Sequence, residues 1–289
     1  EVPSLKQDTL VSLHQINKNL TGDQVLKSLP RITFIDKNKG YFKKNSKYFW
    51  IEKSANDWKV KDWVKLDDNA ENTEIFSDNQ GFVYTIKNNV FLNKITEDQN
   101  EDILNGQAVH QREFGITKGI FVAPDNSQIA FYRMDQSMVK GYPIIDWSVT
   151  PAVNKNIKYP MAGTPSHHVT LGVFNTKTNK KIFLNIIGDP EQYLTSVTWS
   201  PDSKSVFVGV LNRDQNEMQL NQYDAFTGNL LKTIFEEKSE KYVEPQHQLT
   251  FFPNSNTDFI WQSQRTGYSH LFHYYLETGL VSQLTKGNY

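Results

Sequence analysis

"WSPDSKSVFVGVL", residues 199–211, contains the pattern that decides the fold. An aromatic residue leads into a short polar turn, and a strand of alternating apolar residues follows the turn. Asp, Asn and Ser side chains in such turns hydrogen-bond to their own backbone, and Asp and Asn tolerate left-handed geometry. The chain can therefore fold back on itself here, and the pattern predicts two antiparallel strands.

Four further stretches repeat this pattern along the chain. They are "FIDKNKGYFKKNSKYFWIE" at 34–52, which is the poorest copy, "IFSDNQGFVYTI" at 75–86, "VAPDNSQIAFYRM" at 122–134 and "FFPNSNTDFIWQS" at 251–263. A second pair of strands follows most copies, as in "SHLFHYYLETGLVSQLT" at 269–285, and completes a four-stranded unit. A recurrence of roughly 40–50 residues is typical of the blades of a β-propeller. We therefore predict an all-β fold, a partial β-propeller of about five to six blades; a β-sandwich with irregular turns is the alternative.

The sequence outside the repeats divides the chain further. Residues 1–30 include helical spacing of Leu10, Leu13 and Ile16 and a second short helix ending at Pro30, so we expect a helical N-terminal lead-in. The propeller blades then occupy 31–289, with an insertion around 136–168 that is rich in Pro and Gly. The last residues, "LTKGNY", stand where a new blade would begin. We expect that the protein continues, or that another chain completes the ring.

Composition excludes several classes of function. The 289 residues carry a net charge of −1, so no basic field attracts nucleic acid, and the absence of cysteine excludes disulfides and cysteine-ligated metals. No apolar run approaches the roughly 20 residues needed to span a bilayer. Glu1 opens a polar segment with no signal-peptide pattern, and we expect a periplasmic or secreted protein whose signal has been removed.

No complete catalytic apparatus is visible in the sequence. The nucleophile motif G-x-S-x-G is absent, and "GTPSHH" at 163–168 lacks its closing glycine. His167 and His168 are neighbours, which on a strand point to opposite faces, so they are not expected to hold one ion. We therefore predict no cofactor, no metal and no catalytic residue within this chain.

Several stretches resemble one known family. "NGQAVHQREFGITKGIFVAPDNSQIAFYRMDQS", "KYPMAGTPSHHVTLGVFN", "EKYVEPQHQLTFFP" and "FIWQSQRTGYSHLFHY" are similar to the propeller region of dipeptidyl peptidase IV-type serine exopeptidases of the prolyl oligopeptidase family, in particular its Bacteroidetes branch, which includes prolyl tripeptidyl peptidases. The resemblance runs from about residue 75 to the end and preserves the order of the motifs. It implies an eight-bladed propeller above an α/β-hydrolase domain. The Ser, Asp and His of the catalytic triad lie downstream in that domain, which is absent from this chain.

The resemblance also assigns a role to Glu113. In the family, a glutamate on a short propeller segment projects into the cavity and pairs with the ammonium group of the substrate's free N-terminus. Dipeptidyl peptidase IV has two adjacent glutamates here, whereas this chain has Arg112 followed by Glu113, and prolyl tripeptidyl peptidases have a single acid. Cleavage after two residues and cleavage after three therefore both stay open. The alternative is a surface glutamate paired with Arg112 or Lys118.

Further site residues and partners follow from the resemblance. Tyr242 and Glu244 match a loop that borders the cavity in the family, although a simple blade connector would also contain such residues. The expected partners are peptides with a free N-terminus, the C-terminal hydrolase domain and, as is typical of the family, a second copy of the protein. Trp199 and Trp261 fall within the repeats and are predicted to pack between blades. Trp147 lies in the insertion, where it could line the cavity or belong to a dimer arm.

Two functions of different class are compatible with these observations. The first is the amine-recognising, substrate-gating propeller of an exopeptidase that acts on X-Pro-type peptides and is not catalytic on its own. The second is a non-enzymatic propeller that binds a protein partner. The reading frame beyond Tyr289 discriminates between them, because G-x-S-x-G with downstream Asp and His would indicate the enzyme.

Overall fold

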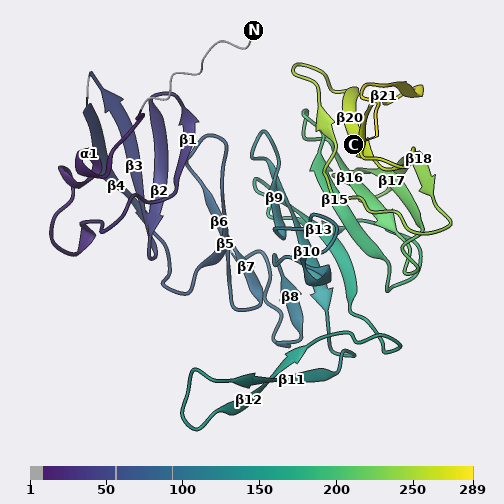
Figure 1. Ribbon diagram of the computed structural model, residues 1–289, viewed down its shortest axis with the longest axis horizontal. Coiled ribbons are helices and arrows are strands. Elements are labelled where there is room, and N and C mark those ends of the chain that lie inside the picture. The colour runs from purple at the N-terminus through teal and green to yellow at the C-terminus, as the bar shows by residue number, and fades with distance from the viewer. Residues whose placement is uncertain (1–8, 56, 93, 289) are drawn as a thin grey trace. The chain divides into compact units, whose positions relative to one another are not determined.

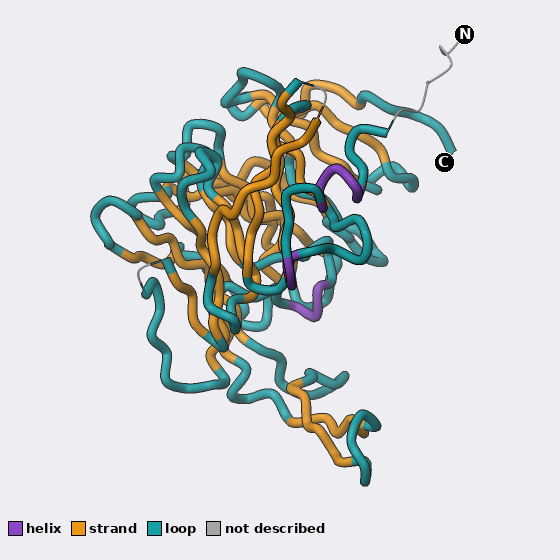
Figure 2. Tube along the Cα trace, turned by 90° about the vertical axis from the view of Figure 1, so that its left-hand side faces the viewer, coloured by secondary structure: helices purple, strands orange, loops and turns teal. Residues whose placement is uncertain are grey.

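The computed structural model describes residues 9–55, 57–92 and 94–288. Short antiparallel strands joined by loops make up most of this part of the chain, with very little helix (Figures 1 and 2). The chain forms two compact units that divide between Ala70 and Glu71. No helix of the described residues is long and apolar enough to cross a membrane.

The first unit is one four-stranded antiparallel sheet with a short helix packed on it. The helix α1 begins after Ser12, whose side chain accepts a hydrogen bond from the backbone N–H of Gln15, while the Gln15 side chain accepts one from the backbone N–H of Ser12. Ile16 is fully buried against aromatic residues of the sheet. The helical lead-in is thus confirmed, but only a single 3₁₀ turn stands where a second helix was predicted. The elements are α1 (Leu13–Asn17), η1 (Gly22–Gln24), β1 (Ile32–Asp36), β2 (Lys39–Lys44), β3 (Lys47–Ser54) and β4 (Asp57–Lys65).

The second unit contains four antiparallel sheets that follow one another along the chain, and a separate hairpin. In the third sheet, β10 is central and pairs with β8, β9 and β13. The second sheet is β5 (Glu71–Ile75), β6 (Phe82–Ile86) and β7 (Asn89–Phe91); the third is β8 (Ile103–Asn105), β9 (Ile120–Val122), β10 (Gln128–Asp135), β13 (His168–Asn175) and β14 (Lys181–Phe183). The fourth is β15 (Tyr193–Trp199), β16 (Ser205–Leu211), β17 (Glu217–Asp224) and β18 (Leu230–Lys238); the fifth is β19 (Thr250–Phe251), β20 (Asp258–Ser263), β21 (His270–Tyr275) and β22 (Gly279–Gln283).

The polar turns of the repeats close these hairpins as their chemistry predicts. In the β15–β16 turn the carboxylate of Asp202 accepts hydrogen bonds from the backbone N–H of Lys204 and from the Ser200 hydroxyl. In the β9–β10 turn Asp125 accepts from the backbone N–H of Ser127, and Asn126 between them has a left-handed φ of 61°. These short-range bonds set where each strand ends, so the strand pairs could be predicted from the sequence.

Successive sheets of the second unit pack face to face through apolar side chains. One cluster joins the second and third sheets, another joins the third and fourth, and another joins the fourth and fifth. Trp199 lies in the cluster between the third and fourth sheets, where its ring N–H donates to the backbone oxygen of Phe121 on the third sheet. Trp261 is buried between the fourth and fifth, which confirms the packing role predicted for both tryptophans. Stacked antiparallel sheets in chain order are blades, and the prediction of an all-β propeller fold is confirmed.

The segment between β10 and β13 leaves the third sheet. It forms a hairpin of β11 (Gly141–Asp146) and β12 (Val153–Lys158), with Gly141 opposite Lys158 and Asp146 opposite Val153. The hairpin projects from the sheet in Figure 1, and Trp147 at its turn is 78% exposed. These two strands were not predicted from the Pro-rich sequence of the segment.

Candidate functional site

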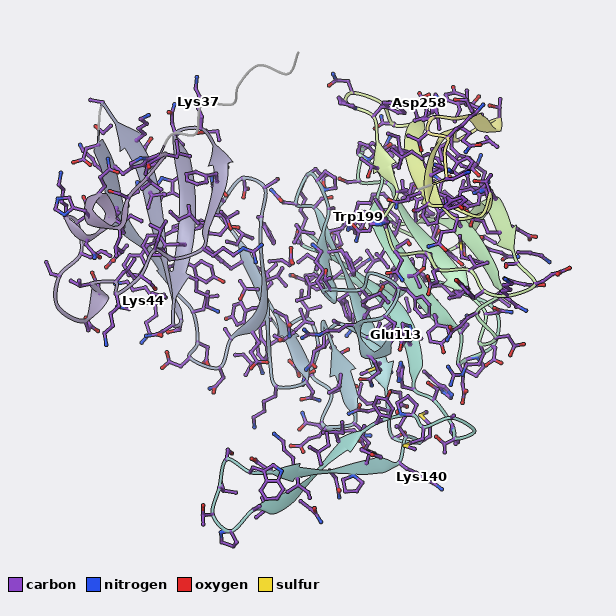
Figure 3. The ribbon with its side chains drawn as sticks, viewed as in Figure 1. Lys37, Lys44, Glu113, Lys140, Trp199 and Asp258 are labelled. Carbon is purple, nitrogen blue, oxygen red and sulfur yellow. The ribbon has the colours of Figure 1, made fainter. Side chains whose placement is uncertain are left out.

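Glu113 lies directly after η2 (His110–Arg112), in a turn with unusual backbone geometry (Figure 3). Three consecutive residues, His110, Gln111 and Arg112, have left-handed φ values of 52°, 55° and 66°, and Phe114 has 53°. Left-handed geometry costs a residue with a side chain about 1–2 kcal/mol. Two backbone bonds close the turn: Arg112 N–H donates to Val109 O, and Glu113 N–H donates to His110 O. Surrounding structure must hold such a turn in place.

The turn directs Glu113 away from the core. Phe114, the next residue, is buried and packs edge-on against the ring of Tyr193, 5.0 Å between centroids. Glu113 and Arg112 are both exposed, and neither makes an ion pair with any residue that the structure describes. Lys118, one of the alternative partners for Glu113, instead binds Glu74 at 2.9 Å. The Glu113 carboxylate is therefore free to meet a cation from outside the chain.

A buried histidine pair lies beneath this turn. The imidazole of His110 is 3% exposed; its Nδ1 lies 3.0 Å from Nε2 of His167, and its Nε2 accepts from the backbone N–H of Leu194 at 3.1 Å. Burial lowers the pKa of His110 well below its usual value, and lowers that of His167 to about 4 with a contribution from the positive charge of Arg213. Both rings are therefore neutral at pH 7. The sequence predicts only that His167 and His168 do not share an ion, and the pairing of His167 with His110 was not predicted.

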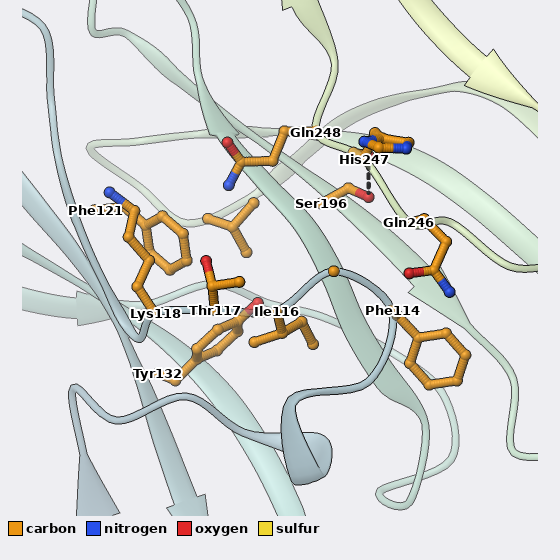
Figure 4. Close-up of a pocket in the computed structure, with 12 residues that line it drawn as sticks. Phe114, Ile116, Thr117, Lys118, Phe121, Tyr132, Ser196, Gln246, His247 and Gln248 are labelled. Atoms are coloured by element: carbon orange, nitrogen blue, oxygen red, sulfur yellow. Dashed lines mark hydrogen bonds between the residues drawn. The ribbon is translucent and has the colours of Figure 1, made fainter.

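The loop that carries Tyr242 and Glu244 touches the Glu113 turn. A Cβ added to Gly115 would lie 2.0 Å from the backbone oxygen of Gln246, so the two backbones are in direct contact. Figure 4 labels Phe114 on the first segment and Gln246 on the second. Val243 is buried in the same apolar cluster as Phe114, while Tyr242 and Glu244 face outward. Two segments predicted separately from the sequence thus form one local structure.

A small cavity borders this contact, and a separate groove lies along the Tyr242–Glu244 segment. A small space of about 20 Å³, bounded by Ile116, Tyr132 and Ser196 among others, has room for about one water molecule (Figure 4). An open groove of about 340 Å³ is lined by Tyr242, Glu244 and cationic neighbours. Glu113 is not among the residues that line these two spaces. Among the described residues no three His, Cys, Asp or Glu side chains are placed to hold a metal ion.

One wall of the 340 Å³ groove contains a largely buried ion pair that was not predicted from the sequence. Glu237 accepts hydrogen bonds from the ring N–H of Trp261 at 2.7 Å and from the Ser263 hydroxyl at 2.8 Å, and it is paired with Arg265. The guanidinium of Arg265 also lies 4.7 Å from the centre of the Phe272 ring. In "FEEK" at 235–238 nothing distinguishes Glu237 from the exposed acid beside it, because the partners come from another sheet.

Known proteins resemble this chain over nearly its whole length. Residues 29–289 match the family model described as the dipeptidyl peptidase IV (DPP IV) N-terminal region. A "probable dipeptidyl-aminopeptidase B" of Phaeosphaeria nodorum is 28% identical over 246 residues, which are 72% of this chain and 27% of that protein. Dipeptidyl aminopeptidase B of Saccharomyces cerevisiae is 26% identical over 202 residues, 65% of this chain and 24% of that protein. The chain thus spans about a quarter of the length of these curated relatives.

Solved structures match the fold as well. The crystal structure of a "putative dipeptidyl aminopeptidase IV" from Bacteroides ovatus is 37% identical, with a TM-score of 0.84 over 98% of this chain and 43% of that one. Porphyromonas gingivalis dipeptidyl peptidase 4 has the same fold at 20% identity, with a TM-score of 0.76 over 97% of this chain and 42% of that one. Sheet order, motif order and these matches agree: the chain belongs to the family of dipeptidyl peptidase IV N-terminal regions.

Proposed function

We propose that this chain is the substrate-gating propeller of a dipeptidyl or tripeptidyl peptidase IV-like serine exopeptidase, and that Glu113 binds the ammonium group of the peptide's N-terminus. The observation that carries the proposal is an exposed carboxylate without a partner among the described residues, held on a strained turn. An ammonium group that leaves water to enter a protein loses its hydration, and a carboxylate close to it offsets that loss. The same contact measures a fixed distance from the amino end of the peptide to the bond that is cut.

The neighbouring groups fit roles around that contact. Arg112 points away from the core beside Glu113 and, as a donor, suits the carbonyl groups of a peptide rather than its ammonium group. Tyr242 and Glu244 line the 340 Å³ groove, in which we place the continuation of the peptide. The proposal covers both removal of two residues and removal of three residues from the N-terminus of the peptide.

The remaining parts of the proposal concern the whole protein. A C-terminal hydrolase domain supplies the serine nucleophile, and the protein acts outside the cytoplasm, in the periplasm or after secretion. We also propose a homodimer, because the β11–β12 hairpin exposes large apolar side chains that a monomer would leave in water. These are Tyr142, Ile144, Ile145, Trp147, Val149 and Val153.

The test of the amine site compares two substrates in the enzyme that contains the hydrolase domain. Glu113→Gln is expected to lower kcat/KM for a free-amino X-Pro peptide by about 10–100-fold, since a charge-assisted hydrogen bond contributes about 1.5–3 kcal/mol. For the N-acetylated peptide kcat/KM is expected to stay unchanged. Glu101→Gln, at another exposed acid without an ion pair in the described part of the chain, is the matched control. An equal loss for both peptides, or no loss for either, would refute the role of Glu113.

A further inference from the structure

The Glu113 turn needs an anchor outside itself. His110, Gln111 and Arg112 before Glu113 are left-handed, and two backbone hydrogen bonds close the turn that they form. Gln111 and Arg112 are exposed, so His110 is the one buried side chain of η2. His110 is therefore the anchor within η2 itself, while Phe114, packed on Tyr193, and Gly115, in contact with Gln246, hold the turn on its other side.

The two hydrogen bonds of that imidazole reach two different sheets. Its Nε2 accepts from Leu194 on β15 of the fourth sheet, and its Nδ1 faces Nε2 of His167, which directly precedes β13 of the third. The Tyr193 ring lies against it edge-on, with centroids 5.0 Å apart. His110 thus ties the turn to both sheets between which it lies.

The direction of these bonds follows from the chemistry of the donors. A backbone N–H only donates, so Nε2 of His110 carries no proton and its Nδ1 carries one. That proton is donated to Nε2 of His167, which then holds its own proton on Nδ1. The arrangement works only with both rings neutral, because a further proton on either ring would place two N–H groups face to face.

The charges around the pair favour this neutral state. Arg213, from the β16–β17 turn, binds Glu191 at 3.5 Å and the hydroxyl of Tyr193, and its charge opposes a proton on either histidine. Glu191, from the loop before β15, accepts from the backbone N–H of Ser166 at 2.8 Å and counters this only in part. His168 on β13 adds to the effect of Arg213 when it is charged.

We propose that His110 and His167 are a positioning pair: their directed hydrogen bond holds the left-handed turn, and so fixes where the Glu113 carboxylate meets the substrate's ammonium group. The inference rests on the proposed role of Glu113. His110 acts through the backbone of the turn, since its carbonyl accepts from Glu113 N–H at 3.0 Å, and neither imidazole touches the substrate. Loss of the pair should weaken ammonium binding and leave the bond-breaking step intact.

The test uses the enzyme that contains the hydrolase domain, with the same free-amino and N-acetylated X-Pro peptides. His167→Leu removes the acceptor for His110 Nδ1–H and is expected to raise KM for the free-amino peptide at least fivefold, with kcat unchanged and the N-acetylated peptide unaffected. His167→Gln supplies an acceptor oxygen and is expected to stay within twofold of wild type. Val206→Ala, a cavity in the buried β16, controls for loss of stability alone.

A double variant separates positioning from a general structural role. In a Glu113→Gln background, His167→Leu is expected to have no further effect on the preference for free-amino peptides, because the carboxylate it positions is gone. A persisting effect, or an equal loss for both peptides, would overturn the inference and leave the role of Glu113 standing. If Glu113→Gln itself leaves the preference unchanged, the proposed function fails and the inference fails with it.

A measurement on the wild-type enzyme covers the case in which His167→Leu does not fold. Imidazole ¹⁵N NMR at pH 7 is expected to show neutral His110 with its proton on Nδ1. Either a charged ring or a proton on Nε2 would overturn the inference, since each is incompatible with a hydrogen bond from Leu194.

Discussion

Gly115→Ala tests whether the Glu113 turn and the Gln246 segment need to touch. Gly115 has a φ of 68°, a left-handed conformation that costs alanine about 1–2 kcal/mol. The new Cβ would lie 2.0 Å from Gln246 O, where an ordinary carbon–oxygen contact is about 3.3 Å. One backbone must therefore move by more than about 1 Å, and overpacking of this kind costs about 1–3 kcal/mol. The free energy of unfolding should fall by about 2–5 kcal/mol in total.

Urea denaturation of wild type and variant measures this loss, and Gly163→Ala is the matched control. Gly163 has nearly the same φ, 74°, but a Cβ there would meet no atom within 4 Å. Its replacement should cost only the conformational part, at most about 1–2 kcal/mol. Gly115→Ala should also weaken free-amino peptide binding, because the displaced segment adjoins Glu113. If the two alanine variants lose equal stability, the contact between the segments is not tight and the reasoning is refuted.

Three further changes have clear expected outcomes. The free energy of unfolding should fall by on the order of 3 kcal/mol as the pH drops from 6.5 to 4, because the pKa of His167 is about 4 in the fold against 6.5 ordinarily, so the unfolded chain binds more protons in this range. Urea denaturation at each pH should show a smaller fall in the His167→Gln variant than in wild type. An equal fall in the two proteins would contradict the assignment. Glu237→Gln should lower the free energy of unfolding by about 3 kcal/mol or more, because it leaves the charge of Arg265 unpaired in a mostly buried site. Glu217→Gln, at the exposed pair with Lys238, should lower it by less than about 1 kcal/mol in the same measurement. Trp147→Ser should shift the protein from dimer to monomer in sedimentation velocity, and an unchanged dimer would exclude the hairpin from the interface.

Strand pairs were predictable wherever a turn is made by local chemistry. Asp125 and Asp202 bond to backbone groups two residues away, and nothing distant is needed to set those turns. The buried position of Trp199 and Trp261 followed from their place in the repeat. The Glu113 segment was identified because of its resemblance to a family, and its outward direction follows from the burial of Phe114 beside it.

The parts that could not be predicted depend on partners far apart in the chain. His110 and His167 are 57 residues apart, and their contact exists only because the fold places the β8–β9 connection beside the segment that leads into β13. Glu237 and Arg265 meet in the same way across the fourth and fifth sheets. The β11–β12 hairpin lacks the alternation of a half-buried strand because it packs on no sheet face, so periodicity had no signal to detect.

The strain in the Glu113 turn is an argument about function in its own right. An exposed carboxylate that served only solubility would need no particular direction, and a relaxed loop would hold it at no conformational cost. Here three left-handed residues precede it, a buried imidazole pair anchors it, and Gly115 after it is in contact with a second loop. Each feature restricts where the carboxylate points. Among the residues described, the carboxylate has no ion-pair partner. A charge held in one direction at such cost is what fixed-distance recognition of a cationic chain end requires.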